Sequence, residues 1–175
     1  MRLRDLAEAL TMGIVSWVRN LWGGEPATAT EQRIASEISE ISEHDAEVAG
    51  LNFLKAIEAH MKWRARLEAV IAGTSGEKLE VATVAKNDVC VLGQWLYGPG
   101  AAHSTFTGFA ELEQLHTAFH KSAAEILLLA QTGRQREATR LLAGDYRATS
   151  VKIGGLLAQL HKHAKQRQEK PPATD

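Results

Sequence analysis

The chain has few of the residues that cross-link a fold or interrupt helices. Its 175 residues include one cysteine and four prolines. A single cysteine cannot form an intramolecular disulfide, so nothing indicates a secreted, disulfide-stabilised fold. Two prolines lie in the C-terminal tail, and the other two, Pro26 and Pro99, lie near glycines. We therefore expect long helices that end near those two points.

Long apolar runs and an excess of charge are missing as well. No signal peptide is visible, and no apolar run reaches the roughly 18 residues that a membrane span requires. Twenty basic and 21 acidic residues leave a net charge of -1, which gives no electrostatic reason to expect nucleic acid as a partner. The sequence therefore predicts a cytoplasmic globular protein that does not bind nucleic acid.

Apolar residues recur at spacings of three and four along most of the chain, and alternation typical of strands persists nowhere. Helical stretches are predicted at residues 3–22, 31–72, 77–97, 102–131 and 134–166. This pattern predicts an all-α protein, an antiparallel four-helix bundle with an additional N-terminal amphipathic helix. The expected divisions are that helix at 1–25, a linker and the start of a long helix at 26–47, the bundle at 48–165, and a disordered tail at 166–175.

Two apolar seams precede the bundle. The first, within residues 3–21, suits docking on this protein or on a second copy. Tryptophans and arginines there would also suit a membrane interface, but Asp5 and Glu8 on the polar face disfavour it. The second seam is expected to serve dimerisation or docking onto a partner and consists of Ile34, Ile38, Ile41 and Val48.

Four further side chains can converge in such a bundle. His116 and His120 are four residues apart and share one helix face, so they can bind one metal ion. His60 and Cys90 lie about 18–20 Å from the turn that joins their helices, at nearly equal height. The heights of all four agree better if the fourth helix begins near Phe109, after a long loop, than if it begins at residue 102.

Three imidazoles and a thiolate form a four-coordinate set that zinc fills. A bound metal would keep the Cys90 thiol ionised near neutral pH. The alternative is that Cys90 is a small buried hydrophobe and that the histidines bind backbone carbonyls. The residues alone leave both interpretations open.

Three sequence blocks resemble the signatures of the chemoreceptor zinc-binding (CZB) domain family, in the family's order and spacing. They are His60-x-x-Trp63-Arg64-x-x-Leu67, Cys90-x-Leu92-Gly93-x-Trp95-Leu96 and Leu112-x-x-x-His116-x-x-Phe119-His120. The resemblance covers roughly residues 48–165, whereas residues 1–47 match no known pattern. It implies an often dimeric four-helix bundle that binds Zn²⁺ through His60, Cys90, His116 and His120.

The resemblance also implies a function in signal transduction. CZB domains are attached to bacterial chemoreceptors and diguanylate cyclases, and they respond to zinc availability or to oxidation of the zinc-bound cysteine by hypochlorous acid. This sequence contains neither a cyclase motif nor a receptor signalling hairpin, so it is either a stand-alone member or a fragment of a longer protein. The initial methionine and the tail favour a stand-alone member, which we expect to be homodimeric. It would sense zinc, or oxidation at Cys90, and signal by helix rearrangement to a chemoreceptor or diguanylate cyclase partner, as in chemotaxis.

Residues near the ligands have expected packing roles. Gly93 would let a neighbouring helix or an imidazole approach the metal. Trp63 and Trp95 would pack in the core and keep water from the site. His103 is expected in a surface loop, with a hydrogen bond to a ligand as the alternative; His161 and His163 are expected in a solvated basic tail.

Other functions compete with the sensor. The same ligands would serve a structural zinc site in a dimerisation or adaptor bundle. A zinc hydrolase needs an open coordination position, which four protein ligands would close, so we do not expect an enzyme. A di-iron carrier needs more carboxylates than the single Glu113–His116 pair provides.

Overall fold

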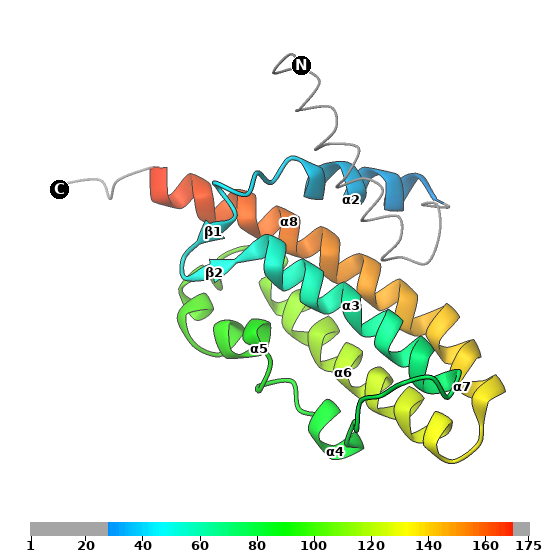
Figure 1. Cartoon of the computed structure of the whole chain (residues 1–175). Helices are drawn as coiled ribbons and strands as arrows, with labels where there is room; N and C mark the ends of the chain where they lie inside the picture. Colours follow the sequence, from blue (N-terminus) through cyan, green and yellow to red (C-terminus); the bar gives the residue numbers. More distant parts are fainter. Residues whose placement is uncertain (1–27, 170–175) are drawn as a thin grey trace, which may run out of the picture.

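The computed structural model describes residues 28–169 and is mostly helical (Figure 1). The elements are, in order, α2 (Ala29–Ser39), β1 (Glu47–Val48), β2 (Leu51–Asn52), α3 (Phe53–Ile71), α4 (Val81–Val84), α5 (Val91–Leu96), the 3-10 helix η1 (Pro99–His103), α6 (Phe109–Gln131), α7 (Gln135–Leu141), the π-helix η2 (Leu142–Tyr146) and α8 (Arg147–Glu169). None of the helices in this part of the chain is long and apolar enough to cross a membrane.

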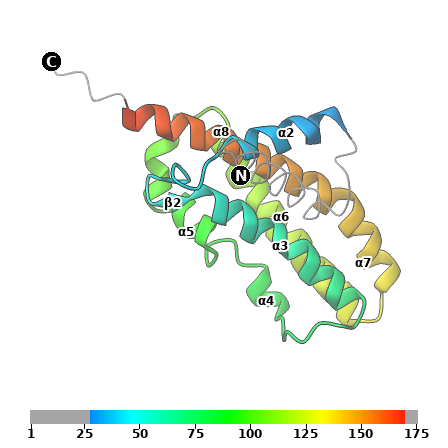
Figure 2. The ribbon, with the colours of Figure 1, turned by 45° about the horizontal axis from the view of Figure 1, so that its top comes forward.

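Three long helices, α3, α6 and α8, pack against one another and form the body of the fold. Helix α2 lies on α8, and the short helices α4 and α5 lie on the side of the body opposite α2 (Figures 1 and 2). The mostly helical prediction is therefore confirmed. The predicted N-terminal helix at 1–25 lies outside the described residues.

The prediction of one long helix over 31–72 is wrong, because a turn and a β-hairpin separate α2 from α3. The Ser42 hydroxyl accepts a hydrogen bond from the Asp45 backbone N–H at 3.2 Å, a local bond that competes with helix formation. Strands β1 and β2 pair antiparallel, and the two residues between them, Ala49 and Gly50, both have positive φ. Such a pair matches the tight turn favoured in hairpins.

The third and fifth predicted helices are also interrupted. Within the third, predicted over 77–97, only α4 and α5 are helical, because residues 86–90 include Asn87 and Asp88, which favour turns over helix. The predicted start of the fourth helix at residue 102 is wrong, since α6 begins at Phe109, the later start that the matching of heights favoured. Within the fifth, predicted over 134–166, Gly144 departs from helical geometry in η2 (φ −98°, ψ −107°), and α8 continues to Glu169.

The expected docking seam of residues 34–48 is instead packed inside the chain. Its four side chains are at most 3% exposed. Helix α8 admits this close approach through a Gly154–Gly155 pair, since a Cβ added at Gly155 would lie 3.0 Å from Ile34 Cδ1. Arg147 at the start of α8 donates to the Glu31 carboxylate at 2.9 Å. The seam is thus part of the core, and its predicted use for dimerisation is wrong.

Replacing Ile38, which is fully buried on α2, should destabilise the protein. We expect Ile38→Ala to lower the free energy of unfolding by about 2–5 kcal/mol, because it removes buried methyl groups and leaves a cavity. Ser36→Ala, on the exposed side of the same helix, should change it by less than about 0.5 kcal/mol. Urea unfolding measures both, and equal effects would contradict the packing of α2 on α8.

Candidate metal centre

Three of the predicted ligands converge. The Sγ atom of Cys90 and one ring nitrogen each of His116 and His120 all lie within 4.8 Å of one another. Cys90 is the residue before α5, and the two histidines lie on successive turns of α6. The shortest contact joins Cys90 Sγ to His116 Nε2 at 3.2 Å. The sequence prediction that Cys90 meets the histidine pair is therefore confirmed.

Backbone packing around Gly93 positions the thiol. The Gly93 backbone N–H donates to Cys90 Sγ at 3.2 Å. A Cβ added at Gly93 would lie 1.8 Å from the carbonyl oxygen of Asn87, so a glycine is required for the loop to fold back over α5. The expectation that Gly93 admits a helix or an imidazole is wrong, because the close neighbour is the backbone of the loop before Cys90.

This loop is anchored to α6 by a side chain that sequence reasoning missed. The Asn87 amide donates to Thr117 Oγ1 at 2.7 Å and to the Tyr97 hydroxyl at 2.8 Å. Thr117 directly follows His116, so the anchor fixes the loop next to the site. An Asn in a polar stretch reads as an ordinary turn residue, and no signal in the sequence distinguishes it.

A backbone carbonyl orients His120. Its Nδ1 donates to the carbonyl oxygen of Val84 at 2.8 Å, which leaves the Nε2 lone pair free to bind a metal. This arrangement, one imidazole nitrogen held by an acceptor and the other free, is the usual one for metal-ligating histidines. It also explains the position of α4, since Val84 is its last residue.

His60 lies in the same pocket but outside the cluster of three. Its ring packs on Phe119 with 3.7 Å between centroids. Its Nε2 is buried and has no hydrogen-bond partner in the protein. Buried polar atoms are almost always paired. An unpaired, buried imidazole nitrogen is therefore what we expect of a metal-ligating histidine when no ion is bound.

The pKa values favour neutral imidazoles at physiological pH. Burial lowers the pKa of His116 to about 4 and that of His60 well below its usual value, with neighbouring histidines adding to both shifts. Burial also lowers the pKa of His120, opposed by its bond to Val84. Burial raises the pKa of Cys90, although nearby backbone N–H groups oppose the shift. Without a metal, the thiol is therefore protonated near neutral pH.

The donor set fits zinc. A thiolate with imidazoles is the usual ligand chemistry of tetrahedral zinc, and neighbouring donor atoms in such a site lie about 3.5 Å apart. The observed 3.2 Å between Cys90 Sγ and His116 Nε2 is close to that spacing. The unpaired His60 Nε2 and the free His120 Nε2 supply further nitrogen donors.

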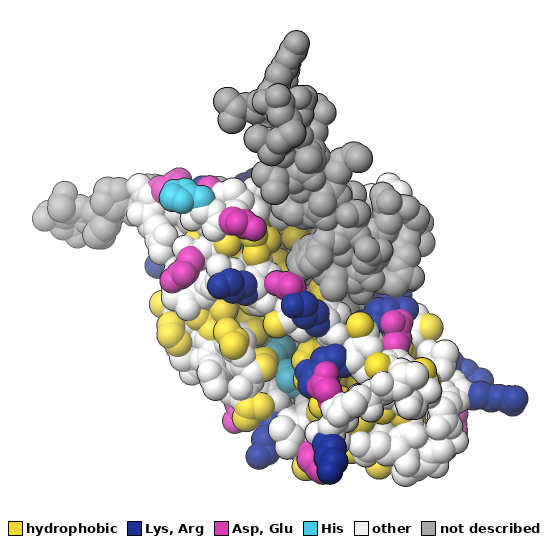
Figure 3. Space-filling model, in the orientation of Figure 1, with side chains coloured by type: hydrophobic (Ala, Val, Ile, Leu, Met, Phe, Trp, Pro, Cys, Tyr) yellow, Lys and Arg dark blue, Asp and Glu magenta, His cyan; other side chains and the backbone are white. Residues whose placement is uncertain are grey.

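A pocket of about 520 Å³ opens beside these residues, with mostly hydrophobic walls. Histidine atoms are visible in a recess on this face, with hydrophobic side chains on one side and charged side chains on the other (Figure 3). Trp63 lines the pocket and is half-buried, with the Arg66 guanidinium 3.9 Å above its ring. Trp95 is a core residue, as predicted, but it does not line the pocket; its Nε1 donates to Ala49 O at 2.8 Å and supports the hairpin.

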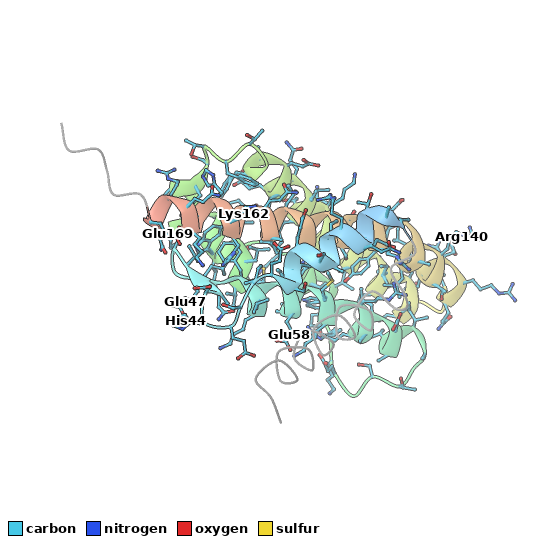
Figure 4. The ribbon with its side chains drawn as sticks, turned by 90° about the horizontal axis from the view of Figure 1, so that it is seen from above. His44, Glu47, Glu58, Arg140, Lys162 and Glu169 are labelled. Atoms are coloured by element: carbon cyan, nitrogen blue, oxygen red, sulfur yellow. The ribbon has the colours of Figure 1, made fainter. Side chains whose placement is uncertain are left out.

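Two of the other histidines, His103 and His161, differ from their predicted surroundings. His103 and His161 are buried, at 8% and 6% exposure, so the surface-loop and solvated-tail predictions for them are wrong. His161 Nε2 donates to Asp45 O at 2.7 Å. His163 is half-buried. His44 is exposed and lies in the segment between α2 and β1, at the edge of the fold (Figure 4).

The candidate metal site lies within a mostly helical fold. Among models of known families, that of the chemoreceptor zinc-binding domain (CZB) matches residues 60–127. The match supports a CZB-family domain over these residues and spans all four predicted ligands. No curated protein and no solved structure matches the chain.

A methyl group at Gly93 should displace the loop that carries Cys90. We expect Gly93→Ala to weaken zinc binding about tenfold or more, because comparable losses follow when the supports of a metal ligand are removed. Competition with a chromogenic chelator measures this affinity. Gly76→Ala is the control, since its Cβ would meet nothing within 4 Å; an unchanged affinity in Gly93→Ala would contradict the proposed support.

Proposed function

We propose that this protein is a zinc-binding regulatory module in which Cys90, His116, His120 and His60 hold the ion. The observation that carries the proposal is the convergence of a thiol and two imidazoles within 4.8 Å inside a CZB-family domain. Bound zinc would supply charge that keeps the thiolate ionised and fixes the donors in place.

The input that we propose is zinc itself or oxidation of Cys90. Cys90 is partly exposed and lines the pocket, so a small oxidant such as hypochlorous acid can reach its sulfur. The sulfur would be oxidised to sulfenic acid while the oxidant is reduced to chloride. Loss of the thiolate removes one of the donors and with it part of the metal affinity.

A row of aromatic contacts offers a route for the signal. His60 packs on Phe119, and Phe119 packs on Tyr146 with 5.0 Å between ring centroids. Tyr146 ends η2, where the helix already departs from regular geometry. The next residue, Arg147, is bound to Glu31 of α2. A movement of His60 toward the other donors would therefore be passed through close-packed rings to η2 and α2.

A zinc hydrolase is the second candidate, favoured by the fact that, within residues 28–169, the cluster brings three donors within 4.8 Å of one another. Three ligands and an adjoining pocket are the usual features of catalytic zinc. However, none of the residues that line this pocket is Asp or Glu, which leaves no carboxylate in the described site to act as general base. We therefore propose a regulatory role, with a homodimer and a chemoreceptor or diguanylate cyclase partner as the setting that the family favours.

Zinc content tests the ligand assignment. We expect about one zinc per chain in the purified parent, and a loss of affinity above about 100-fold in Cys90→Ala and His120→Ala, because removing a ligand costs more than removing its support. Elemental mass spectrometry with chelator competition measures both. His44→Ala, at an exposed histidine, should retain full binding.

His60→Ala separates the two candidate functions. A large loss of affinity in this variant supports the closed four-ligand site. An unchanged affinity would favour the open three-ligand site of a hydrolase. No zinc in the parent, even after zinc is supplied, would contradict both.

Hydrogen exchange tests the aromatic route. In the parent, zinc should slow amide exchange in η2 and α2. Tyr146→Leu should abolish that response while zinc still binds, because it removes the ring that contacts Phe119 without touching a ligand. Tyr146→Phe, which keeps the ring, should respond as the parent does, and so should Leu128→Ala at an exposed position of α6. A zinc response at η2 and α2 that persists in Tyr146→Leu would contradict the route.

A further inference from the structure

A second pair of histidines lies apart from the candidate zinc site, where the C-terminal part of α8 runs beside the segment after α5 (Figure 2). His103 belongs to η1 and His163 to α8, and their ring centroids are 6.3 Å apart at an interplanar angle of 83°. Neither residue lines the pocket at Cys90.

Each of these imidazoles has a buried nitrogen with no hydrogen-bond partner in the protein. The atoms are Nδ1 of His103 and Nε2 of His163, and His103 is only 8% exposed. Burial, with Arg167 and His163 nearby, lowers the pKa of His103, so its ring is neutral and carries a lone pair. Two buried, unpaired imidazole nitrogens on neighbouring rings require an explanation.

The separation of the rings is close to that of two imidazoles on one ion. A zinc–nitrogen bond of about 2.0–2.1 Å places each ring centroid about 3.2 Å from the ion, so two such rings lie about 5.2 Å apart at the tetrahedral angle and at most about 6.5 Å apart in a linear arrangement. The observed 6.3 Å lies near the upper limit, so tetrahedral zinc would draw the two rings about 1 Å closer together. Aromatic neighbours hold both rings in place: Trp95 stacks on His103 at 5.9 Å, and Phe106 packs on His163 at 5.4 Å.

We propose that His103 and His163 form a second, weaker site for a divalent transition-metal ion, with water completing the coordination. Imidazole nitrogen suits zinc, nickel and copper, and the experiment below uses zinc. Occupation of this site would join η1 to the end of α8 at zinc concentrations above those that fill the first site.

Arg167 provides a control variant that should change metal affinity at the second site in the direction opposite to the histidine variants. Its guanidinium donates to Ala102 O at 3.4 Å and to Thr105 Oγ1 at 3.0 Å, and its charge acts on His103. A positive charge near the pair opposes a bound cation. Removing that charge should therefore strengthen metal binding at the second site and leave the first unchanged.

The experiment is equilibrium dialysis of the full chain against increasing Zn²⁺. The parent should bind a tight equivalent and then a weaker one. His103→Ala and His163→Gln should keep the tight equivalent, which shows that they are folded, and lose the weaker one. His44→Ala should keep both, and Arg167→Gln should bind the second several-fold more tightly.

The assignments of the two metal sites can be tested independently of each other. Cys90→Ala should lose the tight equivalent and keep the weaker one, whatever the first site does in the cell. A parent that binds a single equivalent at excess zinc would overturn the second site. Retention of the weaker equivalent by His163→Gln would do so as well, and because His163 is half-buried on a helix surface, that substitution leaves the core intact.

Discussion

The close approach of Asn87 to Gly93 is the constraint on which the metal centre depends. It folds the loop back over α5, and this places the Cys90 thiol against His116 of α6. The bundle alone would provide two histidines on one helix face and a third across from them. The thiol comes from an irregular segment, so its position rests on a few hydrogen bonds and on the absence of one methyl group.

This origin of the donors links metal binding to local stability. His116 and His120 belong to a regular helix, whereas Cys90 and Val84 belong to a segment with only short helices. Segments with few buried apolar contacts open more readily than packed helices do. An ion bound by both α6 and the irregular segment would stabilise the irregular segment far more than α6. The reason is that metal binding stabilises most the part of a protein that is least ordered before the metal binds.

Periodicity and residue spacing predicted the helical class and the meeting of Cys90 with His116 and His120, and the matching of heights favoured a start of α6 near Phe109 over the predicted start at residue 102. These features depend on the rise per residue and on which side chains share a face, and both can be counted in the sequence. The sequence did not predict Val84, because any residue type offers a backbone carbonyl. Nor did it predict the burial of Ile34, since a heptad seam has the same spacing whether it packs on another chain or on the glycines of α8.

The burial of α2 within the fold bears on how a signal can leave the domain. A free seam would have allowed a partner to bind α2 directly, but its apolar side chains are already in the core. In the proposed route, a movement at the site would reach α2 through Phe119, Tyr146 and the Arg147–Glu31 ion pair. That ion pair is partly buried, so breaking it would leave the Glu31 carboxylate in a desolvated position without its partner. Packed contacts of this kind favour discrete arrangements over gradual shifts, which suits the proposed zinc-dependent switch.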